Sequence, residues 1–216
     1  RPFNLDYWSK AFGVGAGNTN ATKPGATGAA VAWTLKAPVV TAFGRRFEDF
    51  RATVQTGVDR TSLQMASKEL QGDMNWYPPG KGDGGERGLL QGHLSRLDLT
   101  AATDAQSGSQ KTAGTEVENL PDLSFRIDEL FWQGKPWGRL SFRARNQKSA
   151  DGQSWRIDPF QLDGQDLKLT GRLNWVTRVN GASRKSPQEN MTALDFKMNS
   201  PQVGNLLTKL GYPGTV

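Results

Sequence analysis

Residues 167–175 read Leu-Lys-Leu-Thr-Gly-Arg-Leu-Asn-Trp and place an apolar residue or a glycine at every second position. Side chains of a β-strand point alternately to the two faces of its sheet, so this period of two predicts a strand with one apolar and one polar face. The same alternation recurs at residues 50–54, 123–127, 140–144 and 194–198. The sequence therefore predicts a mainly β, mostly antiparallel fold.

Two parts of the chain repeat one another. Residues 33–38 align with 123–128, and each run reaches a glycine, Gly44 or Gly134, after the same distance. Further on, residues 70–76 (Leu-Gln-Gly-Asp-Met-Asn-Trp) align with residues 169–175. Chains built from copies of one unit are usually elongated arrays, because a single copy cannot bury its apolar face. We therefore predict the same succession of strands in residues 33–76 and 123–175.

The chain divides into four predicted parts. An N-terminal strand and a flexible Gly-rich stretch occupy residues 1–30, a first β repeat residues 31–100, a flexible loop residues 101–119, and a second β repeat residues 120–216. Within the first repeat, the alternation slips by one residue in 94–99, which predicts a β-bulge in that strand.

One short helix is predicted at about residues 201–210. Ser200 can cap it, Pro201 suits its first turn, and Gly211 can end it in the left-handed conformation. The apolar residues at helical spacing are Val203, Leu206, Leu207 and Leu210. This helix should close one end of the sheet, but it is too short to cover the apolar face. That face needs a second sheet, a curled sheet or a non-protein ligand to cover it.

Composition narrows the classes of function. The chain has 216 residues with a net charge of +6, but its 27 basic and 21 acidic residues are interleaved, which favours a solvated polar face over a nucleic-acid site. The chain has no cysteine, so disulfides and thiolate metal sites are excluded. No apolar run approaches the roughly 18 residues of a membrane span. Because no signal peptide follows Arg1, we expect a processed chain or a piece of a longer protein.

Catalytic patterns are weak. His93 is the only histidine and occupies the strand position that Asp73 and Arg172 take in the other copies, so it should be an outward polar residue. The residues Asp158, Asp163 and Asp166 lack the closing glutamate of a calcium loop, and a turn at Asp163-Gly164 is the better interpretation. We expect neither a catalytic residue, nor a metal, nor a cofactor.

The C-terminal half resembles the YhdP family of AsmA-like proteins. The resemblance rests on residues 120–130, 138–144 and 169–175, and on Leu-Asp-Phe-Lys-Met-Asn-Ser-Pro-Gln-Val-Gly-Asn-Leu-Leu-Thr-Lys-Leu-Gly-Tyr-Pro at residues 194–213. It runs in order over residues 120–216 and more loosely over 31–100. It implies a large periplasmic protein of Gram-negative bacteria, anchored in the inner membrane. Like the related TamB, such a protein would carry phospholipid toward the outer membrane in a curved β-sheet trough.

An apolar lining is the predicted functional site, with phospholipid acyl chains as its partners and with both membranes as partners of the full-length protein. In an open trough, replacing Ala144 with tryptophan should narrow the lipid path with little loss of stability, whereas at a tight site it would destabilise the fold. The predicted lining residues are Phe50, Val54, Met65, Met74, Leu94, Leu123, Phe125, Ile127, Leu140, Phe142, Ile157, Leu169, Leu173, Leu194, Phe196 and Met198.

Two other functions fit the same pattern. The sheet could close on itself as a β-sandwich that scaffolds envelope assembly. Alternatively, exposed residues among the seven tryptophans could bind carbohydrate. Trp76 and Trp175 end equivalent strands, however, which favours packing at the core or the groove edge.

Overall fold

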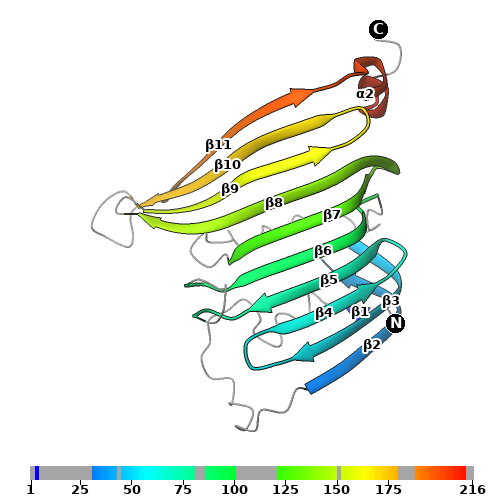
Figure 1. Ribbon diagram of the computed structural model, residues 1–216, viewed down its shortest axis with the longest axis vertical. Helices are drawn as coiled ribbons and strands as arrows, with labels where there is room; N and C mark the ends of the chain where they lie inside the picture. Colours follow the sequence, from blue (N-terminus) through cyan, green and yellow to red (C-terminus); the bar gives the residue numbers. More distant parts are fainter. Residues whose placement is uncertain are drawn as a thin grey trace.

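The computed structural model describes residues 3–4, 31–42, 45–80, 86–100, 121–149, 152–179 and 188–212. These residues form one open, curved sheet and one short helix near the C-terminus, which confirms the mainly β prediction. Figure 1 shows the strands side by side in chain order, with β11 and α2 at one end of the long axis. The division into four parts stays a prediction, since most of residues 1–30 and 101–119 lies outside the described residues.

The described residues contribute eleven strands to the sheet, and the order of these strands in space is their order in the chain. The elements are β1 (Phe3–Asn4), β2 (Val31–Ala42), β3 (Arg45–Thr56), β4 (Thr61–Ala66), β5 (Leu70–Tyr77), β6 (Leu89–Asp98), β7 (Asp122–Trp132), β8 (Lys135–Ser149), β9 (Gly152–Asp163), β10 (Lys168–Val179), β11 (Gln188–Asn199) and α2 (Val203–Lys209).

The two repeats form the same succession of strands, as predicted. Strands β2 to β6 form one antiparallel meander and strands β7 to β11 form another, with Gly72 and Gly171 each in the fourth strand. The registers of the first two strands of each repeat differ by two residues. Leu35 pairs with Ala52, whereas Phe125, the counterpart of Leu35, pairs with Phe142, which is the counterpart of Phe50. A shift of two residues leaves every side chain on its original face.

The repeats join through a parallel pair, which the prediction of an antiparallel sheet missed. Strands β6 and β7 run in the same direction, with Leu90 beside Leu123 and Leu94 beside Ile127. The short strand β1 is also parallel to β2. Parallel neighbours need a connection of a dozen or more residues, and the chain between β6 and β7 is long enough to return to the same end of the sheet.

The predicted bulge is present in β6. Gln71 pairs with Arg96 and Gly72 with Leu94, which leaves Ser95 as the extra residue. A second irregularity lies in β9, where Ala144 of β8 pairs with Ile157 but Phe142 pairs with Phe160.

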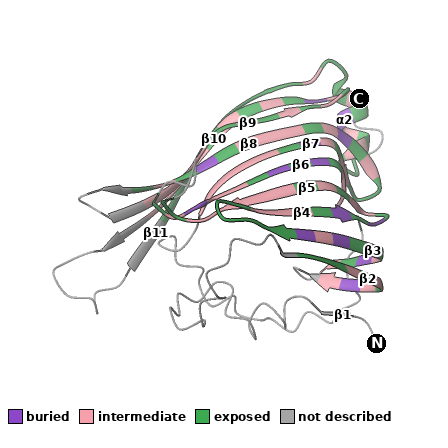
Figure 2. Cartoon of the chain, turned by 60° about the horizontal axis from the view of Figure 1, so that its bottom comes forward, coloured by how far each residue is buried: buried purple, intermediate pink, exposed green. Residues whose placement is uncertain are grey.

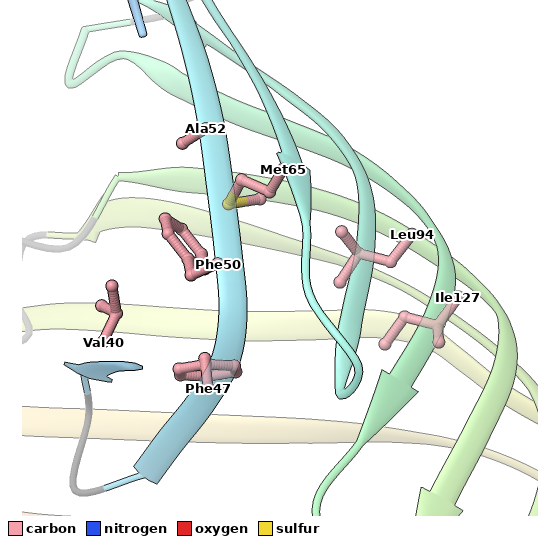
Figure 3. Close-up of a cluster of buried hydrophobic side chains, with 7 residues drawn as sticks. All are labelled: Val40, Phe47, Phe50, Ala52, Met65, Leu94 and Ile127. Carbon is pink, nitrogen blue, oxygen red and sulfur yellow. The ribbon is translucent and has the colours of Figure 1, made fainter. Parts of the chain in front are cut away.

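Two clusters of buried side chains stabilise the sheet. The larger draws residues from β2, β3, β4, β6 and β7 and so crosses the junction between the repeats. Figure 3 shows its side chains on the same side of the curved strands. Its members are Val40, Phe47, Phe50, Ala52, Met65, Leu94 and Ile127. The smaller cluster contains Trp137, Leu167 and Leu206, so α2 packs on one end of the sheet as predicted.

The helix differs from the prediction at its start. It begins at Val203, after Pro201, and its N-cap is Gln202 with no side-chain cap. Ser200 instead donates a hydrogen bond from its hydroxyl to the Asp166 carbonyl. The end is as predicted, because Gly211 has a φ of 93° and its N–H bonds to the Thr208 carbonyl.

Candidate functional site

Three rows of apolar side chains cross the strands on one face of the sheet, here called the apolar face. Each row consists of directly paired residues on neighbouring strands, and successive residues of a row are about 4.8 Å apart. The first row is Ala52, Met65, Gly72, Leu94, Ile127, Leu140, Leu162, Leu169 and Met198; the second is Val54, Leu63, Met74, Gly92, Phe125, Phe142, Phe160, Gly171 and Phe196; the third is Trp76, Leu90, Leu123, Ala144, Ile157, Leu173 and Leu194.

The predicted lining residues all lie on the apolar face. Phe50 lies outside the rows but precedes Ala52 by two residues in β3, and the remaining predicted residues occur in one of the rows. The first and second rows continue from β3 to β11 without a charged residue. The alternation within single strands therefore adds up to a continuous apolar surface across both repeats.

Phenylalanines of the second row lie over glycines. The rings of Phe125 and Phe142 stack with centroids 5.5 Å apart and an angle of 18° between their planes. A Cβ atom on Gly92 would lie 2.4 Å from the Phe125 ring, and one on Gly171 would lie 2.8 Å from the Phe160 ring. Both glycines thus leave room for the aromatic ring of a neighbouring strand.

Exposure rises along the apolar face from β6 to β11. Leu94 and Ile127 are buried, Leu140 and Leu169 are half-buried, and Met198 is 59% exposed. Leu194 and Phe196 are exposed by 55% and 51% in the same strand. Figure 2 shows buried positions mainly on strands β3 to β8. The apolar face is therefore most open to a ligand at β11.

Ala144 lies on the apolar face at a tightly packed position. This residue is fully buried, with 0% of its surface exposed, between Leu123 and Ile157 in the third row. A tryptophan at this position would have to displace its neighbours. The alternation predicted the correct face for Ala144. It could not predict how far this side chain is exposed, because exposure depends on how the neighbouring strands curve.

Several residues of the apolar face were missed. Leu63 and Leu90 alternate correctly with residues of their own strands, so the period of two could have found them. Phe160 and Leu162 follow the irregularity in β9, which changes the parity after Ile157. A strictly alternating pattern cannot extend across such a bulge.

The opposite face, here called the polar face, is crossed by ion pairs. The Asp128 carboxylate lies 2.6 Å from Nε2 of His93, 3.0 Å from Nε of Arg126 and 3.7 Å from Nε of Arg139. Hydrogen bonds from His93 and then Arg126 hold the pKa of Asp128 below its usual value. His93 lies on this face beside Asp73, as predicted, and here it links β6 to β7.

The three aspartates of residues 158–166 each have a basic partner. Asp158 pairs with Arg156 at 2.7 Å, Asp163 with Lys168 at 3.6 Å, and Asp166 with Lys209 at 2.8 Å. The predicted turn follows Asp163, where the Gly164 N–H bonds to the Leu167 carbonyl. Across the described part of the chain, no group of three or more acidic, histidine or cysteine residues is arranged to hold a metal ion.

The tryptophans pack mainly at the sheet ends and edges. Trp137 is buried against α2, and its indole N–H bonds to the Trp132 carbonyl. The Trp155 indole donates to the Pro121 carbonyl and lies opposite Trp175. Trp33 and Trp132 are exposed. The indole N–H groups of Trp137 and Trp155 are thus both used within the protein.

The family model for YhdP proteins matches the chain over residues 1–216. The chain belongs to the YhdP family. This is a family of AsmA-like lipid-transport proteins of the cell envelope, and it is not known for enzymatic activity. The open curved sheet is the architecture that the resemblance implied.

Neither the characterised proteins nor the solved structures include a match to this YhdP-family chain. Within the described ranges, no helix has both the length and the hydropathy that crossing a membrane requires.

Proposed function

We propose that this chain is a segment of a bridge-like periplasmic protein that carries phospholipid between the inner and outer membranes. One observation carries the proposal, namely that the apolar rows continue across both repeats of a single open sheet. The rows run across the strands, along the direction in which the strands are stacked. A lipid that follows them would pass from one repeat to the next without meeting a charged side chain.

The energetics favour movement along the rows. Burying one methylene group contributes about 0.8 kcal/mol, so acyl chains are held by apolar contact alone. A step to the next strand, about 4.8 Å away, exchanges one set of aliphatic or aromatic contacts for a similar set. The barrier between successive positions is therefore low, and the charged head group can stay in water.

A closed β-sandwich is less well supported. That scaffold function needs two packed sheets, whereas the described strands form one. The buried cluster at β2 to β7 gives the sheet a core of its own. Half-buried row residues such as Leu63, Met74 and Leu90 continue the rows over the first repeat, and the most exposed row residues lie in β11.

Crosslinking at the open end of the apolar face tests the proposal. A photoreactive phenylalanine analogue replaces Phe196, and in a matched variant it replaces Lys197, the next residue on the opposite face. Each protein is irradiated with vesicles of phosphatidylethanolamine and phosphatidylglycerol and then weighed by mass spectrometry. We expect phospholipid adducts at position 196 and far fewer at 197. Equal labelling at both positions, or none at 196, would contradict a lipid-binding apolar face.

Native mass spectrometry of the unmodified chain gives an independent measurement. A lipid conduit should retain phospholipid through purification, whereas a closed scaffold should give only the mass of the protein. Absence of bound lipid together with absence of crosslinks at position 196 would favour the scaffold.

A further inference from the structure

Within the ranges that the structure describes, two arginines in the middle of β8 lack the ionic partners that most charged groups of the polar face have. Arg96 contacts Glu129, Arg126 and Arg139 contact Asp128, and Lys168 contacts Asp163. By contrast, neither Arg143 nor Arg145 makes an ion pair or a side-chain hydrogen bond within the described part of the chain. Both are exposed on the polar face.

Their surroundings add positive charge. Arg145 lies directly opposite Arg156 on β9, and like charges on facing residues destabilise a sheet. The Arg156 guanidinium is already paired with Asp158 at 2.7 Å. The other nearby carboxylate, Asp122, accepts a hydrogen bond from the Asn146 backbone N–H at 2.8 Å. Neither carboxylate makes an ion pair with the arginines of β8.

Two adjoining hollows share this pair of arginines. One has a volume of about 340 Å³ and is also lined by Gln91, Asp122 and Ser124. The other has a volume of about 280 Å³ and is also lined by Gln147, Arg156 and Asp158, the last two paired with each other. Arg143 and Arg145 thus lie between two recesses that contain further hydrogen-bonding side chains.

The spacing of the arginines suits a phosphate group. Arg143 and Arg145 are two residues apart and lie on the same face of one strand. Their Cα atoms are therefore about 6.7 Å apart, so both side chains can contact a single anion. A guanidinium donates two parallel hydrogen bonds to phosphate oxygens, a geometry that lysine cannot reproduce. The Ser124 hydroxyl, directly opposite Arg143, can donate a further hydrogen bond.

We propose that Arg143 and Arg145 form a phosphate-binding site on the polar face, for a phosphate ester or a free phosphate. This site is independent of the proposed conduit, since it lies on the face opposite the apolar rows. The phosphate comes either from the head groups of an anionic membrane surface or from a soluble phosphate.

Binding of two probes distinguishes these sources. The intact chain is titrated with inorganic pyrophosphate, followed by the NMR signals of the arginine Nε–H groups, and is separately sedimented with vesicles of phosphatidylcholine containing phosphatidylglycerol. Binding of pyrophosphate alone identifies a soluble ligand, whereas vesicle binding that R143Q/R145Q loses identifies a head group, because binding through the apolar face would persist in that variant. Binding of neither probe overturns the proposal.

Matched variants separate a site from general charge attraction. The double variant R143Q/R145Q should lose at least tenfold in affinity, because it removes both charges and their charge-assisted hydrogen bonds. R143K/R145K keeps the charge but loses the paired donors, and should also weaken binding. The control is R51Q, an exposed arginine of the same face opposite Lys36 and outside both hollows, and it should bind normally. Equal losses in R51Q and in the double variant would overturn the proposal.

Discussion

At the residue scale, glycines shape the apolar face as much as the large side chains do. The Phe125 ring occupies the space above Gly92, and the Phe160 ring occupies the space above Gly171. A glycine in a strand often marks a place where another group approaches the backbone closely. These two positions allow the phenylalanine row to lie flat on the sheet.

Gly92→Ala should therefore destabilise the fold. Its new Cβ would lie 2.4 Å from the Phe125 ring, which must move out of its stack with Phe142. Overpacking of this kind costs about 1–3 kcal/mol, measurable as a lower urea midpoint. Gly57→Ala is the milder comparison and should lower the midpoint less, because its Cβ would lie 3.3 Å from the Arg60 carbonyl and needs a shift of only a few tenths of an ångström. Equal midpoints for Gly92→Ala and the unmodified chain would contradict the close contact.

His93→Ala should raise the pKa of Asp128. The hydrogen bond from His93 is the largest cause of the lowered pKa, so removing it brings the carboxyl closer to its usual value. NMR titration of the Asp128 carboxyl carbon measures this directly. Gln64→Ala, an exposed change on β4, should leave the titration unchanged.

The same carboxyl makes stability depend on pH. A lowered pKa in the folded protein means that folding is favoured at pH values above the usual pKa of an aspartate, and that this contribution is lost as the pH falls through the lowered value. The loss of folding stability on acidification should be smaller in the His93→Ala variant than in the unmodified chain. An unchanged pKa in that variant would show that the contact with Arg126, rather than the hydrogen bond from His93, lowers the pKa of Asp128.

At the element scale, β11 combines an edge position with an exposed apolar row. It pairs with β10 on one side, and Leu194, Phe196 and Met198 project from it on the apolar face. Long exposed edges are normally protected in soluble proteins. Because these side chains are exposed, substitutions in β11 can change lipid binding without destabilising the sheet.

Leu194→Asp should reduce bound phospholipid by at least about tenfold, because an unpaired charge among acyl chains is strongly disfavoured. The control is Ala193→Asp, its neighbour on the polar face, opposite Asn174. Both positions are exposed, so both variants should keep the circular dichroism of the unmodified chain. Equal lipid retention in the two variants would argue against lipid on this face.

Helix α2 depends on a single buried side chain. Leu206 packs against Trp137 and Leu167, while Lys209 pairs with Asp166 at 2.8 Å. Leu206→Ala should cost about 2–5 kcal/mol locally and increase hydrogen exchange in residues 203–212. Val203→Ala, at an exposed position, should change exchange little. Equal exchange in the two variants would mean that α2 is held by its polar contacts.

At the scale of the whole molecule, the parallel pair β6–β7 makes one sheet of two repeats. The larger buried cluster continues across this junction from β2 to Ile127, and the Asp128 contacts join β6, β7 and β8 on the other face. In arrays of repeats, stability depends on such interfaces between neighbours.

Ile127→Ala should therefore destabilise strands on both sides of the junction. Ile127 is buried beside Leu94 and Leu140, and its truncation should cost about 2–5 kcal/mol. We expect faster hydrogen exchange in β3 to β8 but little change in β11, which lies four strands away from β7. Exchange that rises only in the second repeat would show that the repeats fold independently.

Much of the candidate site was predictable because it depends on alternation within single strands. The pattern placed all of the proposed lining residues on one face, and the slip after Leu94 correctly indicated the bulge at Ser95. It failed after Ile157, where the irregularity in β9 moves Phe160 onto the apolar face. It could not decide between an open and a tight site at Ala144, whose burial arises from residues of β7 and β9.

The sequence by itself determined the strands, their two faces, the repeat and the helix end at Gly211, because pleating and helix termination depend on residues close together in the chain. Only the tertiary structure decided the parallel pairing of β6 with β7 and the two-residue difference in register between the repeats. It also decided that the apolar face is buried at Ile127 and open at Phe196. These properties depend on which distant segments pair and how the whole sheet curves, and no local pattern encodes that.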